Sequence, residues 1–184
     1  MTRSVFTVGH STRPLREFVE LLQQAEVERV VDVRAFPHSR TNPQYNQERL
    51  PDSLAPFGIG YMHIPELGGR RGPARPPVPA TVNGFWHNAS FHQYADYALS
   101  DEFRVGLDRL IELGQHQTCA IMCSEAVWWR CHRRIIADYL LHRGIPVYHL
   151  MGRDRIVPAR PTEAATGRDD YRLVYPLTEK DART

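Results

Sequence analysis

Short runs rich in β-branched and aromatic residues alternate along this chain with segments of helical periodicity, and no other feature limits the fold as strongly. The β-rich runs lie at residues 5–8, 30–33, 61–64, 119–122 and 147–150. Between them, apolar residues recur at the spacing of one helical face, first at Leu15, Phe18, Val19 and Leu22. This alternation is typical of α/β domains with parallel sheets. We therefore predict a single three-layer, Rossmann-like α/β domain with a mostly parallel sheet of about five strands.

Two segments fall outside this alternation. Residues 151–184 form a polar, arginine-rich extension with one apolar patch at 171–177, and we expect it to pack on the domain at 1–150 or to trail from it. Residues 65–92 contain a run of glycine, proline and arginine at 68–79. A loop of this length in a compact domain is typically functional or disordered, so we expect either a mobile cover over a neighbouring pocket or an ordinary flexible insertion.

Composition excludes several classes of protein. No run approaches the roughly 20 apolar residues of a membrane span, and the N-terminus lacks a long apolar signal core. The three cysteines cannot all pair within one chain, which indicates a reducing, cytoplasmic setting. The net charge of +2 is too small to indicate nucleic acid by itself. Of the 23 basic residues, 22 are arginine, which reflects either a GC-rich genome or the use of planar donors for phosphate or carboxylate.

Polar side chains follow the predicted strands at their carboxyl ends, where open α/β sheets bind ligands. Because parallel strands end at one edge, these residues should converge. The convergent set is His10 and Ser11 after the first strand, Asp32, Arg34, Arg40, Asn42, Tyr45 and Asn46 after the second, Glu66 after the third, Cys123 and Glu125 after the fourth, and His149 on the fifth.

The segment 123–134 is the most unusual part of the chain. We expect a helix to begin directly after Cys123, with Ser124 as its cap and Glu125 in its first turn. A helix N-terminus and nearby arginines would stabilise a thiolate at Cys123, whereas Cys119 and Cys131 would lie in the core. The alternative is a structural cysteine buried at the end of a strand.

Three kinds of chemistry are compatible with this segment. A thiolate loop of the phosphatase or rhodanese kind would have five residues between cysteine and arginine, but six separate Cys123 from Arg130. A metal could bind near Cys123, Cys131 and His132, although the spacing is not that of a structural zinc site, and no particular cofactor is indicated. Carboxylate chemistry would use Glu125 or Glu66 as acid or base.

Several motifs together make the sequence familiar. They are the segments 7–12, 31–34 with Pro37 and Ser39–Arg40, 42–46, 65–69, 94–97, 122–125 and 131–133. Over roughly residues 4–150 the chain resembles the family known as domain of unknown function 488, DUF488. The resemblance implies a Rossmann-like α/β domain of bacterial type and marks the same strand-end residues, but it supplies no reaction.

We therefore expect an enzyme or enzyme-like pocket for a nucleotide or another anion derived from nucleic acid. Cys123, Glu125 and Asp32 are the candidate catalytic residues. The candidate ligand-binding residues are His10, Ser11, Arg34, Arg40, Asn42, Tyr45, Asn46, Glu66, Trp128 and Arg130, in which aromatic rings for stacking accompany arginines for phosphate. One alternative is thiol chemistry at Cys123, either sulfur transfer or phosphoryl hydrolysis. Another is a non-catalytic module that binds nucleic acid or a protein through residues 68–79.

Overall fold

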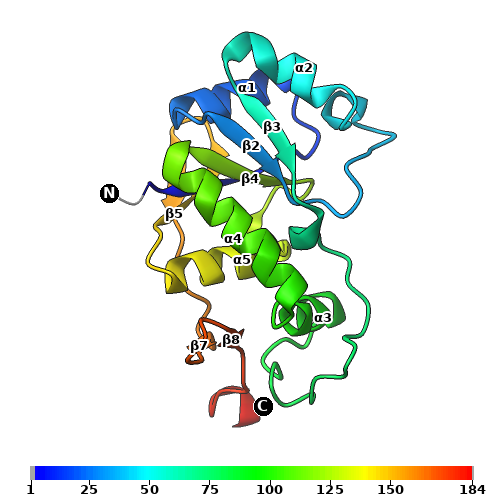
Figure 1. Ribbon diagram of the computed structural model, residues 1–184, viewed down its shortest axis with the longest axis vertical. Coiled ribbons are helices and arrows are strands. Elements are labelled where there is room, and N and C mark those ends of the chain that lie inside the picture. The colour runs from blue at the N-terminus through cyan, green and yellow to red at the C-terminus, as the bar shows by residue number, and fades with distance from the viewer. Residues whose placement is uncertain (1–2, 184) are drawn as a thin grey trace.

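The computed structural model describes residues 3–183, which form a mostly parallel sheet with helices on both faces (Figure 1). The six strands of the sheet are β1 (Val5–Gly9), β2 (Arg29–Asp32), β3 (Gly60–His63), β4 (Cys119–Cys123), β5 (Val147–Gly152) and β6 (Arg155–Pro158). Their order is β3-β2-β4-β1-β5-β6, and only β6 runs antiparallel to its neighbour. The predicted three-layer α/β fold is confirmed, with β6 as an additional edge strand.

The helices divide between the two faces of the sheet. On one face, α1 (Leu15–Gln24) and α2 (Leu50–Leu54) pack against Val8 and Val30. On the other face lie α3 (Ala89–Tyr97), α4 (Asp101–His116) and α5 (Arg133–His142). Within residues 3–183, none of these helices is long and apolar enough to cross a membrane.

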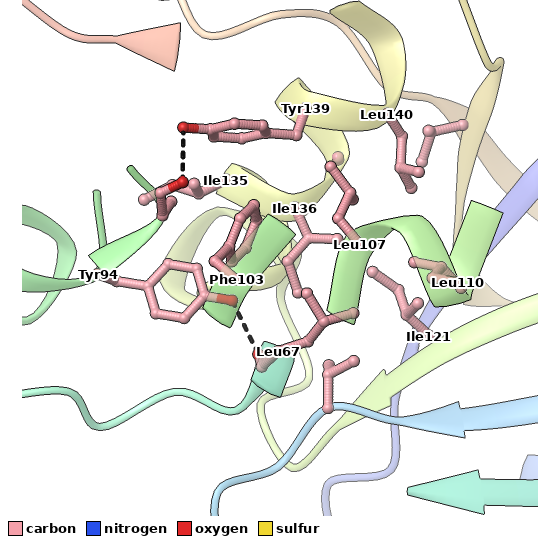
Figure 2. Packing of buried hydrophobic residues seen from close by; sticks show 14 of the residues in the cluster. Leu67, Tyr94, Phe103, Leu107, Leu110, Ile121, Ile135, Ile136, Tyr139 and Leu140 are labelled. Carbon is pink, nitrogen blue, oxygen red and sulfur yellow. Dashed lines mark hydrogen bonds between the residues drawn. The ribbon is translucent and has the colours of Figure 1, made fainter. Parts of the chain in front are cut away.

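The larger core lies between the sheet and the helices α3, α4 and α5 (Figure 2). Phe103, Leu107 and Ile136 pack there, and the buried Tyr94 hydroxyl donates a hydrogen bond of 2.8 Å to the Leu67 carbonyl oxygen. This bond ties α3 to η3 (Pro65–Leu67), the short helix that follows β3. The start of the long 65–88 connection is therefore fixed to the core.

The residues after 151 contribute to the same fold. β6 completes the sheet, and β7 (Thr166–Gly167) pairs with β8 (Leu173–Val174) in a small separate sheet. Beyond β8, Tyr175 is fully buried, and its hydroxyl donates to Asp138 at 2.9 Å. The apolar patch noted at 171–177 thus includes side chains that pack into the core beneath α5.

The expected helix directly after Cys123 is absent from the described structure. Residues 124–127 form a loop, η4 (Trp128–Arg130) follows as a single 3-10 turn, and α5 begins only at Arg133. The prediction that Ser124 caps a helix is therefore wrong. The backbone here is held by the residues that follow β1, because the Ser11 amide donates to the Ser124 carbonyl oxygen at 3.0 Å.

Candidate functional site

A cavity of about 430 Å³ opens at the carboxyl ends of β1, β2 and β4, and its size is within the range of small-molecule sites. The pairings of Gly9 with Cys123 and of Asp32 with Met122 bring these three strand ends together. The residues that line the cavity are His10, Arg34, Ala35, Phe36, His38, Ser39, Gly69, Arg70, Ser90, Phe91, Tyr94, Cys123, Ser124, Glu125, Arg130, Cys131 and His132.

Glycine at position 9 allows the loop after β4 to cross the end of β1. A Cβ atom at Gly9 would lie 1.8 Å from the carbonyl oxygen of Glu125, so no other residue fits without a backbone shift. The amide of His10 donates to the Cys123 carbonyl oxygen at 2.9 Å and extends the ladder past the strands. This close approach holds Cys123 and Glu125 at the cavity wall.

Two cysteines lie against each other in that wall. The sulfur atoms of Cys123, at the end of β4, and Cys131, just before α5, are 2.7 Å apart. Both thiols are free, and only 3% of Cys123 and 5% of Cys131 is exposed. The Arg133 amide donates to the Cys131 sulfur at 3.4 Å, so this sulfur lies at the N-terminal end of α5 and bonds the first amide of the helix. The helix N-terminus expected at Cys123 is thus found at Cys131, where its partial positive charge favours a thiolate.

Arg133 supplies the positive charge next to the pair. Its side chain is 1% exposed and donates to the Cys123 sulfur at 3.0 Å, to the Thr7 hydroxyl at 3.1 Å and to the Glu125 carbonyl oxygen at 2.7 Å. Within residues 3–183, no carboxylate forms an ion pair with it. Because a buried cation without a counter-charge is costly, the guanidinium favours a negative charge on the cysteine pair.

The two thiols therefore differ in acidity. Burial raises the pKa of Cys131, but the hydrogen bond from Cys123 and the charge of Arg133 outweigh it and lower that pKa to about 6. Burial and the hydrogen bond with Cys131 raise the pKa of Cys123 well above its usual value. Cys131 is therefore the more acidic thiol of the pair, and loss of one proton from the pair favours a thiolate at Cys131.

His132 is held with one ring nitrogen toward Cys131. Its Nε2–H donates to the Val33 carbonyl oxygen at 2.7 Å, which leaves Nδ1 directed at the Cys131 sulfur, 3.5 Å away. Burial lowers the pKa of His132, so the ring is neutral and Nδ1 is an acceptor. A Cβ at Gly69 would lie 2.9 Å from this nitrogen, so the glycine gives the 68–69 segment room to pack on the ring.

A second buried polar network connects Arg133 to Thr7 and His149. The Thr7 hydroxyl accepts from Arg133 and therefore donates its own proton to His149 Nδ1, 2.7 Å away. Burial lowers the pKa of His149 to about 4, so this ring is neutral. Trp128 stacks on it with ring centroids 4.5 Å apart. The His149 ring is thus linked to Cys123 through Thr7 and Arg133.

Asp32 and Arg34 form a closed pair beside the cavity. Both oxygens of the fully buried Asp32 accept from Arg34, which also donates to the Tyr45 carbonyl oxygen at 2.7 Å. The remaining guanidinium nitrogen lies 3.2 Å from His10 Nε2, and His10 Nδ1–H donates to the Ser11 carbonyl oxygen. Burial lowers the pKa of His10 to about 4. These groups shape the wall, and Asp32 orients Arg34 without facing the cavity.

The mouth of the cavity carries the free charges. Arg70 and Arg130 are exposed there, beside Ser124 and the half-buried Glu125. Neither arginine forms an ion pair within residues 3–183. Phe36, of which 69% is exposed, lies on the same rim. The mouth therefore offers two cations and an aromatic face to an incoming molecule.

Of the residues predicted to gather at the strand ends, His10, Arg34, Cys123, Glu125 and Arg130 line the cavity. The others lie outside its lining. Ser11, Asp32, Tyr45 and Asn46 lie behind it, Trp128 stacks on His149, Arg40 is exposed, the Asn42 amide donates to the Ser39 hydroxyl, and Glu66 packs near Gly106 of α4. Sequence patterns did not indicate Arg133 or Thr7. Cys131 lies in the core as predicted, and it also lines the cavity. The start of the apolar face at Ile135 could have indicated Cys131 as a helix cap.

No group of three or more His, Cys, Asp or Glu side chains is arranged to hold a metal ion within the described part of the chain. Cys131 contacts both Cys123 and His132, and Arg133 donates hydrogen bonds to the sulfurs of both cysteines. The site is thus built as a hydrogen-bonded thiol cluster.

Comparison with known families gives one match. Residues 14–140, more than half of the chain, match the family described as domain of unknown function DUF488. The match spans β2 to β4, both cysteines of the pair and Arg133. No curated protein and no solved structure matches the chain.

Proposed function

The chain belongs to the DUF488 family, whose description states no activity, and we propose that the protein is an enzyme in which the Cys131 thiolate attacks a small anionic substrate. The observation that supports this most directly is the contact of the Cys131 sulfur with the Arg133 amide at the N-terminal end of α5, on the wall of the cavity. A thiolate is the nucleophilic form of cysteine, and the lowered pKa of Cys131 favours this form near neutral pH.

The charges at the mouth favour an anionic substrate. Arg70 and Arg130 are free to bind a carboxylate or phosphate, and Ser124 adds a hydroxyl donor. The aromatic faces of Phe36 and Phe91 suit a planar ring, so a nucleotide or an anion derived from nucleic acid belongs to this substrate class. Glu125 also lines the cavity and is placed to give a proton to a leaving group or take one from water.

The backbone of the 123–131 loop favours sulfur chemistry over phosphoryl hydrolysis. A phosphate-binding loop directs several free amides at one oxyanion. In this loop the Val127 amide donates to the Glu125 carboxylate, and the amides of Arg130 and Cys131 donate to the carbonyl oxygens of Val127 and Trp128. These amides do not converge on the cavity, so a sulfur electrophile suits the thiolate better than a phosphoryl group.

Alkylation tests the proposal. The native protein is treated with iodoacetate or iodoacetamide over a range of pH, and labelling of each cysteine is measured by peptide mass. We expect Cys131 to react first, with an inflection near its lowered pKa of about 6, and the buried Cys119 to react last. The ratio of the rates with iodoacetate and iodoacetamide should fall in Arg130→Gln, because the variant removes a cation that attracts only the charged reagent. Labelling of Cys131 no faster than Cys119 would refute the proposal.

A non-catalytic module that binds nucleic acid through residues 68–79 has less support. Arg71 is turned inward, where it donates to the carbonyl oxygens of Pro65 and Gly68 and lies 3.9 Å from the ring centroid of Tyr97. Of the three arginines in this loop, Arg70 and Arg75 are exposed. A salt-dependent shift of labelled RNA or DNA that is unchanged in Cys131→Ser would favour this second function.

A further inference from the structure

We propose that Cys123 and Cys131 form a reversible dithiol–disulfide couple that reduces small anionic disulfides, with Cys131 as the attacking residue and Cys123 as the resolving residue. This inference rests on the proposed Cys131 thiolate and adds a second cysteine and a substrate class. The two sulfurs come from different elements, the end of β4 and the residues just before α5, and their separation of 2.7 Å exceeds a disulfide bond of about 2.05 Å by less than 1 Å.

The reaction consists of two successive thiol–disulfide exchanges. The Cys131 thiolate attacks one sulfur of a disulfide R–S–S–R, forms the mixed disulfide Cys131–S–S–R and releases R–S⁻. Cys123 then loses its proton to the water of the cavity and attacks the Cys131 sulfur, which releases the second R–S⁻. The substrate gains two electrons and the pair is oxidised to a disulfide. A small dithiol of the solution returns the pair to its reduced form by the same exchange.

Arg133 explains why the second step follows the first. While Cys131 is an anion, its charge and its hydrogen bond keep Cys123 protonated. Formation of the mixed disulfide removes that charge and leaves the buried guanidinium without an anion. The Arg133 Nε–H already points at the Cys123 sulfur, 3.0 Å away, so the negative charge passes to Cys123 as the first step ends. The same cation thus serves each thiolate in turn.

The cavity limits the size and charge of the disulfide substrate. Because both sulfurs are almost fully buried, only a substrate that enters the cavity reaches Cys131. Arg70 and Arg130 at the mouth favour a disulfide with carboxylates. Cys119, four residues upstream on β4, is not part of the lining and serves as an internal control.

The probe is 5,5′-dithiobis(2-nitrobenzoate), an aromatic disulfide with two carboxylates, and 4,4′-dithiodipyridine is its uncharged counterpart. We expect the native protein to release two equivalents of nitrothiobenzoate and to keep none bound. Cleavage by trypsin after Arg130 separates the two cysteines, so peptide mass should show them in one disulfide-linked pair of peptides, which dithiothreitol separates. Arg130→Gln should slow only the charged probe, by up to about fivefold, as for an exposed ion pair.

Three variants assign the steps. Cys123→Ser should release one equivalent and retain the mixed disulfide on Cys131, Cys131→Ser should release almost none, and Cys119→Ser should behave as the native protein. A native protein that stops at a stable mixed disulfide on Cys131 would overturn this inference and leave the proposed thiolate enzyme standing. Failure of Cys131 both to alkylate and to exchange would overturn both. Both of these refuting results are measured on the native protein, so the test does not depend on whether a variant folds.

Discussion

Replacement of Arg133 by methionine should raise the pKa of Cys131 and slow its reactions near neutral pH. Methionine keeps an unbranched apolar side chain in the buried space but removes the charge and the donors to Cys123, Thr7 and Glu125. The substitution therefore tests whether the buried guanidinium holds the anion of the cysteine pair, on which both proposals depend.

The size of the effect follows from the position of the charge. An opposite charge within about 4–6 Å lowers a pKa by about 1–3 units, and each unit is worth about 1.4 kcal/mol. Loss of Arg133 should therefore move the pKa of Cys131 from about 6 to between about 7 and 9. At pH 7 the thiolate fraction would fall from about nine tenths to between about one half and one hundredth. The second part of the stabilisation, from the N-terminal end of α5, stays in place.

The assay is the pH profile of iodoacetamide labelling at Cys131, read by peptide mass. Arg134→Met is the matched control, because Arg134 is the next residue of the same helix but donates to Thr162 and lies over the Trp86 ring. Arg133→Lys keeps the charge with fewer donors and should give an intermediate pKa. Circular dichroism establishes that each variant is folded.

An unchanged profile in a folded Arg133→Met protein would refute this reasoning. It would mean that the helix terminus and the Cys123 thiol alone stabilise the anion. If Arg133→Met does not fold, a native-like profile in Arg134→Met together with a raised pKa in Arg133→Lys still supports the reasoning, and a pKa equal to that of the native protein in Arg133→Lys contradicts a role for the donor geometry.

Three further predictions concern stability and are measured by urea denaturation. Because Cys131 ionises near pH 6 when folded and near 9.0 when unfolded, the folded state binds fewer protons between these values. The free energy of unfolding should therefore rise from pH 6 to pH 9, and a rise of equal size in Cys131→Ser would contradict the assignment. Gly9→Ala should lower the free energy of unfolding by about 1–3 kcal/mol, because the added Cβ clashes with the loop after β4. Gly114→Ala, which has room in α4, should raise it by up to about 1 kcal/mol. Tyr175→Ala should cost about 3–5 kcal/mol if residues beyond 151 are part of the core, and a cost below about 1 kcal/mol would show that they are not.

The pattern of the sequence determined the fold class and the edge at which the cavity lies. The five parallel strands coincide with the apolar runs, because a strand covered on both faces must be apolar along its length. The polar residues that follow these runs include His10, Arg34, Cys123 and Glu125, all of which line the cavity. This much can be predicted because parallel strands place their carboxyl ends at one edge whatever the details of packing.

The identity of the reactive group was decided by tertiary structure. Sequence periodicity indicates that a helix contains Ile135 and Ile136, but it does not show that the chain first crosses the end of β1 and so delays the helix to Arg133. That delay moves the helix terminus from Cys123 to Cys131. Arg133 likewise resembles any of the other arginines until Thr7, from β1, meets its side chain inside the core. Hydrophobic periodicity is a local property of the chain, whereas the charge on a buried thiol depends on groups that only the folded backbone brings within a few ångströms.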